Sequence, residues 1–407
     1  MHPRRSLLMA AALTGLLVSG KASASDPQTS VPSQASPVLD RLIEQRMEEA
    51  GLVGLGAAII IDRKLVWSRG YGYSDKQQAV RFTPDTVMNI GSISKTFTGV
   101  ALMQAMQDGK LSLDANINAY LPFKVVNPSF PGDPITLRQL ATHTSGITDR
   151  WSVYQGTYHW GGDAPESLDD FLKGYLVAGG RQYSKENFLP FKPGTHREYS
   201  NIAAGLAGYI VELAVGEKLN VYTHRRIFEP LHMDHSGWLL SEIPHAAHST
   251  LYVAQDGFSI PIPWYGMTTY PDGGVRTSVA DLSRFFIALL DDGRYQGTRI
   301  LDRSSAAEML RFQYTGSNKP DNVLLSEKNS GIFWSTKFNV TRMGHGGSDP
   351  GMRTEMLSDL QKHVAVILMV NTSVPEPESK VYASLLDDLW RHAATLERQA
   401  QQDQGDG

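Results

Sequence analysis

The segment from Ser92 to Lys95 places a hydroxyl and an amine three positions apart in the sequence. We expect a helix to begin here, because residues 97–106 are apolar at helical spacing and Gly109 follows as an end signal. Side chains three positions apart share one face of a helix, so Lys95 can reach Ser92 directly. Backbone N–H groups near a helix start can also stabilise an oxyanion. The spacing predicts a serine nucleophile beside a base, although a capping serine followed by a solvated lysine fits the same residues.

The segment Tyr199–Asn201 is a second candidate for the same site. A phenol at Tyr199 can relay a proton, and the amide of Asn201 can hold a substrate carbonyl or steady Lys95. A helix-capping asparagine beside a buried tyrosine explains the same pair without any chemistry.

A third candidate is the glycine-rich segment Gly344–Ser348. Glycines let a backbone approach a ligand closely, so the N–H of Ser348 could be a second oxyanion donor beside that of Ser92. A tight turn between edge strands is the alternative interpretation.

The composition is that of an ordinary globular chain, with 407 residues of which 41% are hydrophobic and 20% charged. A chain of this size can bury a sizeable core in one or two domains, and its composition excludes disorder. The net charge of −4 includes no sustained basic run, so we expect no nucleic-acid partner. Cysteine is absent, which excludes disulfides and a thiolate nucleophile.

Residues 1–24 have the pattern of an export signal, with two early arginines, an apolar run over 7–18 and small residues at Ala22–Ala24. That run is shorter than the roughly 20 apolar residues of a membrane span. We expect cleavage before Ser25, which removes three basic and no acidic residues and takes the net charge from −4 to −7. A periplasmic or secreted protein without a stable membrane span follows. The arginine pair also partly resembles a twin-arginine signal, so the export route stays open.

The remaining chain divides into a polar linker at 25–37, a catalytic domain at 38–398 and a short tail at 399–407. Strand patterns lie near both ends of the catalytic domain, and helical patterns dominate its middle. We therefore expect an α/β (α+β) fold in which an antiparallel sheet from both ends (about 38–85 and 330–398) is flanked by helices. A mainly helical region (about 86–329) is inserted, and the cleft where the layers meet is the natural site. The expected strands are 56–61, 65–69, 342–347, 353–358 and 363–371, and the expected helices are 38–50, 97–106, 136–143, 168–176, 201–215, 221–228, 279–290, 304–312 and 379–396.

Taken together, the three motifs resemble those of the serine β-lactamase and penicillin-binding peptidase superfamily, most closely its class C-like branch. That branch is marked by Ser-x-x-Lys, Tyr-x-Asn and a late Lys/His-x-Gly in this order, and the segments 92–95, 199–201 and 345–347 match each of them. The stretches 135–146 and 272–281 are also similar to the family, so the resemblance covers nearly all of the mature chain. It implies a β-lactamase/transpeptidase-like fold, without a metal or another cofactor.

The resemblance also implies an acyl-enzyme mechanism. Ser92 is the expected nucleophile, Lys95 the acylation base after burial lowers its pKa, and Tyr199 the group that protonates the leaving atom and activates water. Which of Lys95 and Tyr199 takes the first proton stays open. The other expected site residues are the oxyanion donors, the N–H groups of Ser92 and Ser348, and the substrate-binding residues Asn201, His345 and Gly347.

The expected function is that of an exported serine hydrolase of peptidase or amidase type, acting on a peptide or small molecule. A carboxylesterase, a weak β-lactamase and a penicillin-binding sensor that stays acylated remain open, because the motifs do not report the leaving group. Class C β-lactamases usually carry lysine where His345 stands. A histidine that is neutral at pH 7 supplies no fixed charge for a substrate carboxylate, so strong β-lactamase activity is not expected. The motifs also do not indicate the oligomeric state.

Two other kinds of site fit the sequence poorly. Residues 346–349 approach the Gly-x-Ser-x-Gly elbow of α/β-hydrolases, but Pro350 stands where the last glycine is needed. Two histidine pairs have a spacing that suggests zinc but lack the glutamate of a His-Glu-x-x-His motif, so we interpret them as loop histidines. These pairs are His232 with His235 and His245 with His248.

Overall fold

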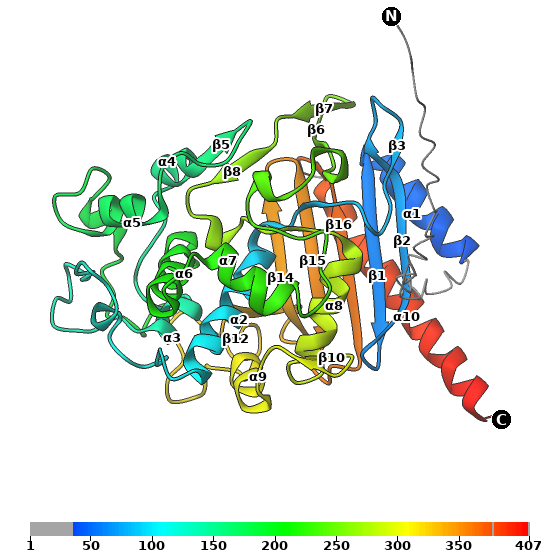
Figure 1. Cartoon of the computed structure of the whole chain (residues 1–407). Helices are drawn as coiled ribbons and strands as arrows, with labels where there is room; N and C mark the ends of the chain where they lie inside the picture. Colours follow the sequence, from blue (N-terminus) through cyan, green and yellow to red (C-terminus); the bar gives the residue numbers. More distant parts are fainter. Residues whose placement is uncertain (1–35, 377, 406–407) are drawn as a thin grey trace, which may run out of the picture.

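Strands from both ends of the chain form one antiparallel sheet. The structure, a computed structural model, describes residues 36–376 and 378–405, so the expected export signal and nearly all of the expected linker lie outside the described residues. In Figure 1 the blue N-terminal strands stand beside the orange C-terminal strands, and β1 pairs with β16. The expected fold class is confirmed. In spatial order the strands are β12 (Ser330–Gly331), β13 (Trp334–Lys337), β14 (Arg342–Asp349), β15 (Met352–Asp359), β16 (Val364–Val370), β1 (Gly54–Ile61), β2 (Lys64–Asp75) and β3 (Val80–Arg81).

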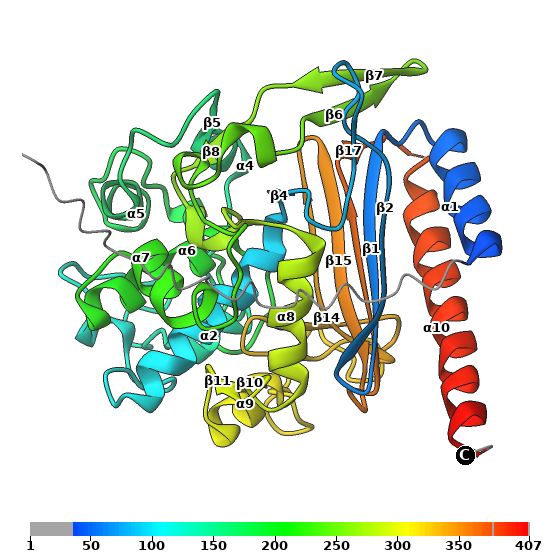
Figure 2. The ribbon, with the colours of Figure 1, turned by 45° about the vertical axis from the view of Figure 1, so that its right-hand side comes forward.

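Each face of this sheet carries its own apolar core. Successive side chains of a strand point to opposite faces, and in β16 residues 365, 367 and 369 belong to one core while 364, 366, 368 and 370 belong to the other. The terminal helices α1 (Pro37–Glu49) and α10 (Val381–Gly405) cover one face, as Figure 2 shows, and α8 (Val279–Leu290) packs on the opposite face. The sheet is therefore buried on both sides, which explains the continuous apolar run of β16.

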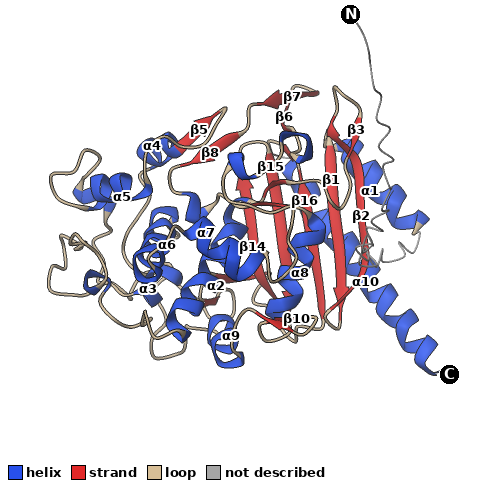
Figure 3. Cartoon of the chain, viewed as in Figure 1, coloured by secondary structure: helices blue, strands red, loops and turns tan. Residues whose placement is uncertain are grey.

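The inserted region between β3 and β12 is mainly helical, and Figure 3 shows its helices gathered on one side of the sheet. Several short strands also occur there, which the sequence patterns did not predict. The remaining helices are α2 (Ser94–Gln107), α3 (Leu137–Ala141), α4 (Trp151–Tyr154), α5 (Leu168–Leu176), α6 (Asn201–Val215), α7 (Leu219–Thr223) and α9 (Arg303–Leu310). The short strands are β4 (Met88–Asn89), β5 (Tyr158–Trp160), β6 (Leu251–Gln255), β7 (Phe258–Ile262), β8 (Tyr265–Met267), β9 (Arg276–Thr277), β10 (Arg294–Tyr295) and β11 (Thr298–Arg299), and β17 (Thr372–Ser373) follows β16 and pairs with β6.

Two helices differ most from the expectation. The last helix continues to Gly405 instead of ending near 396, because the residues that follow are mostly good helix formers such as glutamine and alanine. The helix expected over 221–228 is divided, since α7 ends at Thr223 and a π-helical turn occupies His224–Phe228. Within the described residues, no helix combines the length and the apolar character that a bilayer span requires.

Candidate active site

Ser92 lies in a short 3₁₀ turn, Gly91–Ile93, and α2 begins only at Ser94. The expectation that the helix begins at Ser92 was therefore wrong by two residues. Residues three apart eclipse one another in a 3₁₀ turn, so the spacing still brings the two side chains together. Lys95 Nζ lies 2.9 Å from Ser92 Oγ.

Two glycines allow the turn that carries Ser92 to pack directly against β14. A Cβ on Gly347 would lie 2.1 Å from the carbonyl oxygen of Ile90. Gly91 has a φ of +53°, and a Cβ there would lie 3.3 Å from the backbone nitrogen of Ser348. The two backbone nitrogens expected to hold an oxyanion, those of Ser92 and Ser348, thus lie on adjoining segments.

Lys95 is completely buried, and its amine faces three oxygen atoms. Nζ lies 2.7 Å from Asn201 Oδ1, 2.8 Å from the carbonyl oxygen of Asp272 and 2.9 Å from Ser92 Oγ. Amide and carbonyl oxygens only accept hydrogen bonds, so two N–H groups of the amine are committed to them. The third position faces the Ser92 hydroxyl. Of the two roles considered for Asn201, the structure contains the contact with Lys95.

The pKa of Lys95 is raised, whereas the sequence analysis expected it to be lowered. Burial does act to lower this pKa, but Tyr199 and the carboxylates of Asp272 and Asp349 outweigh it. The resting side chain is therefore an ammonium. Its positive charge favours negative charge on either hydroxyl oxygen beside it.

Tyr199 and Asn201 enter the site at the start of α6. The hydroxyl of Tyr199 donates to Ser92 Oγ at 2.8 Å, so the phenol and the amine meet at the same serine oxygen. Ser200 caps the helix, because its Oγ accepts a hydrogen bond from the N–H of Ala203 at 3.0 Å. Asn201 is therefore not the cap, and its side chain is free to turn toward Lys95.

Asp149 holds this helix start in place. Its carboxylate accepts hydrogen bonds from Ser200 Oγ at 2.7 Å and from the backbone N–H groups of Asn201 at 2.7 Å and Ile202 at 3.1 Å. A carboxylate at a helix N-terminus satisfies free N–H groups and complements the helix dipole. Sequence reasoning missed Asp149, because no local pattern connects it with a helix that starts far along the chain.

His345 lies in the site as a neutral imidazole. Its Nδ1 is 2.7 Å from the carbonyl oxygen of Gly346, which can only accept, so Nδ1 carries the proton and Nε2 is an acceptor. Burial and the nearby ammonium of Lys95 lower the pKa of His345 to about 3. The residue therefore supplies no positive charge at neutral pH, which agrees with the argument made from the sequence.

Two further carboxylates are buried next to the catalytic turn. The hydroxyl of Tyr154 donates to Asp272 Oδ1 at 2.8 Å, and that of Tyr158 donates to Asp349 Oδ1 at 2.6 Å. A Cβ on Gly91 would lie 2.8 Å from Asp349 Oδ2. Burial raises the pKa of Asp272 to about 7 and that of Asp349 to about 6. Both acids stand near glycines in the sequence, and no apolar run there indicated that they are buried.

A cleft of about 490 Å³ opens beside Ser92. One wall of it includes Ala141, the last residue of α3, and His143, which follows the helix. Lys95 and Asn201 do not line the cleft: Lys95 contacts Ser92 from within the protein, and Asn201 contacts Lys95. The expected site residues that line it are Ser92, Tyr199, His345, Gly347 and Ser348.

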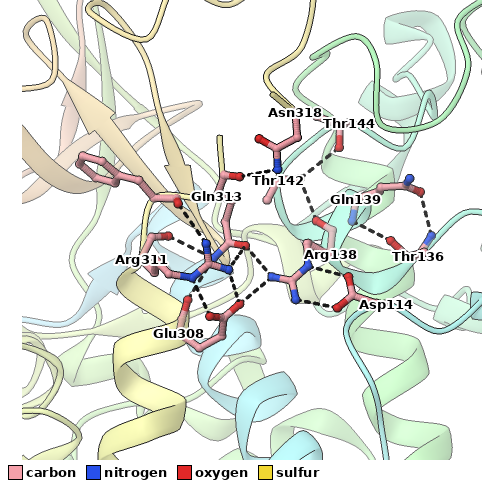
Figure 4. A network of polar contacts seen from close by, with 11 residues as sticks. Asp114, Thr136, Arg138, Gln139, Thr142, Thr144, Glu308, Arg311, Gln313 and Asn318 are labelled. Carbon is pink, nitrogen blue, oxygen red and sulfur yellow. Dashed lines mark hydrogen bonds and ion pairs between the residues drawn. The ribbon is translucent and has the colours of Figure 1, made fainter. Parts of the chain in front are cut away.

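A polar network behind this wall ties α3 to α9, as Figure 4 shows. Arg138 of α3 donates to both carboxylate oxygens of Asp114, at 2.6 and 2.7 Å. It also donates to Glu308 of α9 at 2.6 Å. Thr136 caps α3 in a capping box with Gln139. The network fixes the short helix whose C-terminal end forms part of the cleft.

The family model described as Beta-lactamase matches residues 39–389, so the chain belongs to the Beta-lactamase family. Protein flp of Staphylococcus aureus strain N315 is 25% identical over 260 residues, which cover 63% of this chain and 49% of that protein. The chain thus spans about half the length of the curated relatives it matches first. The superfamily expected from the motifs is confirmed.

Solved structures share the fold. The structure titled as the octameric penicillin-binding protein homologue from Pyrococcus abyssi has a TM-score of 0.70 and 24% identity, covering 88% of this chain and 77% of that one. The D-amino acid amidase from Ochrobactrum anthropi SV3, complexed with L-phenylalanine amide, has a TM-score of 0.66 and 23% identity, covering 88% and 99%. At these identities the likeness concerns the fold.

Proposed function

We propose that the protein is an exported serine hydrolase that cleaves amide or peptide bonds through an acyl-enzyme on Ser92. The supporting observation is the convergence at Ser92 Oγ of Lys95 Nζ at 2.9 Å and the Tyr199 hydroxyl at 2.8 Å. A buried amine and a phenol that meet at one hydroxyl in a cleft activate a nucleophile and have no evident structural task. An amide is the first substrate class to test, since a protein of the same fold is a D-amino acid amidase.

The raised pKa of Lys95 changes the role that we assign to it. An ammonium cannot accept the proton of Ser92, so we assign this proton transfer to the phenol oxygen of Tyr199, which lies 2.8 Å from Ser92 Oγ. Tyr199 then returns the proton to the leaving nitrogen and takes another from the water that hydrolyses the acyl-enzyme. The N–H groups of Ser92 and Ser348 hold the oxyanion, each contributing roughly 3–4 kcal/mol to the transition state. His345 and Gly347 border the substrate, and Asn201 holds the Lys95 amine in place.

Covalent labelling tests the nucleophile. Wild type, Ser92→Ala and the control Ser259→Ala are treated with a fluorophosphonate and a fluorescent penicillin; Ser259 lies on β7 and does not line the cleft. We expect label on wild type and on the control, and none on Ser92→Ala. Persistent label on Ser92→Ala would show that another residue is the nucleophile.

Turnover separates the proposed function from its alternatives. Peptides, short-chain esters and a cephalosporin are compared with the same enzyme preparation. Peptide turnover without ester turnover supports a peptidase or amidase, and ester turnover without any peptide turnover identifies a carboxylesterase. Acylation by one equivalent of penicillin without further turnover would identify a sensor.

We also propose that residues 1–24 direct export and are removed before Ser25. N-terminal sequencing of the protein recovered from periplasmic and extracellular fractions tests this. A protein that keeps its first residues and stays in the cytoplasmic fraction would contradict the proposal.

A further inference from the structure

The cleft beside Ser92 has an excess of positive charge. Glu355 is the single acidic side chain among the described residues that line it, and Glu355 is already paired with Lys337. No acidic side chain of the described part of the chain lies within ion-pair distance of Lys328 or Arg197. The basic residues that line the cleft are Arg197, Lys328, Lys337 and Arg353.

Hydrogen bonds hold the ammonium group of Lys328 in place at the cleft. Its Nζ donates to Ser335 Oγ at 2.7 Å and to the carbonyl oxygen of Thr336 at 3.0 Å, which leaves one N–H of the ammonium without a partner among the described residues. Ser335 pairs with Gly344, the residue before His345. The β13–β14 pairing therefore links Lys328 to the strand that borders Ser92.

Arg197 lines the same cleft. It precedes Tyr199 by two residues, so the segment that delivers the phenol to Ser92 also delivers the guanidinium. Two cations that share a cleft without a counter-ion repel one another, and a protein tolerates this cost where a ligand supplies the missing negative charge. His345 lines the same cleft as a neutral group, so it neither supplies nor needs a counter-charge.

We propose that Lys328 and Arg197 form a subsite for a carboxylate of the substrate, next to the bond that Ser92 attacks. This inference rests on the proposed hydrolase function and specifies its substrate as an anionic amide or peptide. A lysine offers a point charge and an arginine a planar pair of donors, and together they suit a carboxylate. The subsite lies on the β12–β13 side and uses neither of the motif residues Asn201 and His345.

The charge of Lys328 changes at mildly alkaline pH. Burial, with Arg197 and Lys337 as positive neighbours, lowers the pKa of Lys328 to about 8. The amine loses its charge as the pH rises through that value, so the preference for an anionic substrate should decline above about pH 8. The charged or titratable groups around Lys328 are Arg197, Lys337, Glu355, which pairs with Lys337, the neutral His143 and His345, and the preceding Glu327, which makes no ion pair with it.

Matched substrates test the subsite by turnover. An N-acetyl dipeptide with a free C-terminal carboxylate is compared with its C-terminal amide, and phenyl hemisuccinate with phenyl butyrate, so that the charge lies in the leaving part or in the acyl part. We expect Lys328→Met and Arg197→Gln each to lower kcat/KM for the anionic member of one pair by about 10- to 100-fold, the range of a charged hydrogen bond. The kcat/KM for the neutral member of each pair should change less than about 3-fold, which is the usual range for a surface substitution that removes no specific interaction.

Two variants serve as controls. Lys328→Arg keeps a positive charge and should retain the anionic preference at high pH, where wild type loses it. Lys173→Met removes one exposed positive charge on α5, away from the cleft, and should leave both substrates unaffected. Fluorophosphonate labelling at the wild-type rate shows that each variant is folded and keeps its nucleophile. With labelling intact, equal losses for both members of each pair, or no loss in either, would overturn the subsite.

A binding measurement keeps the inference separate from the proposed function. Calorimetry with Ser92→Ala compares N-acetylalanine, N-acetylalanine amide and inorganic phosphate, with and without Lys328→Met. We expect the acid to bind more tightly than the amide, and Lys328→Met to weaken the acid alone. Binding of phosphate in place of the acid, or binding of neither anion, would overturn the assignment even if the enzyme hydrolyses amides. Absent turnover and labelling in wild type would instead overturn the hydrolase.

Discussion

The buried carboxyl group of Asp272 should make the protein less stable as the pH rises. One of its oxygens accepts a hydrogen bond from Tyr154 at 2.8 Å, and the other has no partner among the described residues. Burial raises the pKa of Asp272 to about 7, while an aspartate in an unfolded chain titrates near 3.9. Between these two values the folded protein holds a proton that the unfolded chain has released.

The sign of the effect follows from this difference in bound protons. Unfolding releases the proton, so the free energy of unfolding falls as the pH rises, by at most about 1.4 kcal/mol per pH unit. The contribution is fully present below about pH 4 and is lost by about pH 7. A difference of about three pKa units corresponds to roughly 4 kcal/mol over this window.

Urea unfolding of wild type and Asp272→Asn at a series of pH values from about 4 to 8 measures the effect. The variant removes the titration and keeps an acceptor for Tyr154. The unfolding free energy of wild type minus that of the variant should fall by about 4 kcal/mol across the series. Asp256→Asn, in the β6–β7 turn, removes an exposed carboxylate and should show no such trend. A difference that stays constant with pH for Asp272→Asn would refute the claim that folding desolvates this carboxyl group.

Three further substitutions test how the site is built. Tyr199→Phe removes the hydroxyl at Ser92 and should slow fluorophosphonate labelling by about 10²- to 10⁴-fold at an unchanged melting temperature, and a wild-type labelling rate would exclude Tyr199 from proton transfer. Asp149→Asn should lower the free energy of unfolding by about 1–2 kcal/mol in urea titrations, because the carboxylate holds three donors at the start of α6, and an unchanged midpoint would contradict that role. Gly347→Ala places a methyl group 2.1 Å from the carbonyl oxygen of Ile90, so thermal unfolding should begin several degrees lower, and an unchanged melting temperature would mean that the turn can retreat.

The long elements were predictable from local patterns. The helices α6 and α8 have the bounds that apolar periodicity indicated, and β16 was recognisable as a short apolar run of strand length. The strands β12 and β13 were not, because two to four residues carry no period. Pairing of β13 with β14, and of β12 with β13, determines their position, and pairing of this kind leaves no local signature.

In the candidate site, too, the features with a local pattern were predictable and those that depend on the fold were not. Ser92, Lys95 and Tyr199 converge in the structure as the three motifs together suggested, since each motif has a recognisable spacing. The protonation of Lys95 was predicted wrongly, because burial is visible in an apolar sequence whereas the buried carboxylates near it are not. Lys328 lies in a polar loop that no motif marks, and only the fold brings it to the cleft.

Lys95 and Lys328 differ in the source of the negative charge that balances them. This difference relates the catalytic mechanism to the charge of the substrate. The charge of Lys95 is stabilised by nearby acidic groups of the protein, Asp272 and Asp349, so it is available to the reaction whichever substrate is bound. Lys328 faces other cations, and its charge is compensated only when an anion enters the cleft. An anionic substrate would therefore raise the pKa of Lys328 and strengthen its own binding, whereas a neutral substrate would meet an uncompensated positive wall. The neutrality of His345 is consistent with this arrangement. A fixed cation at that position of β14 would add to the repulsion among the positive charges of the cleft, which the substrate must relieve.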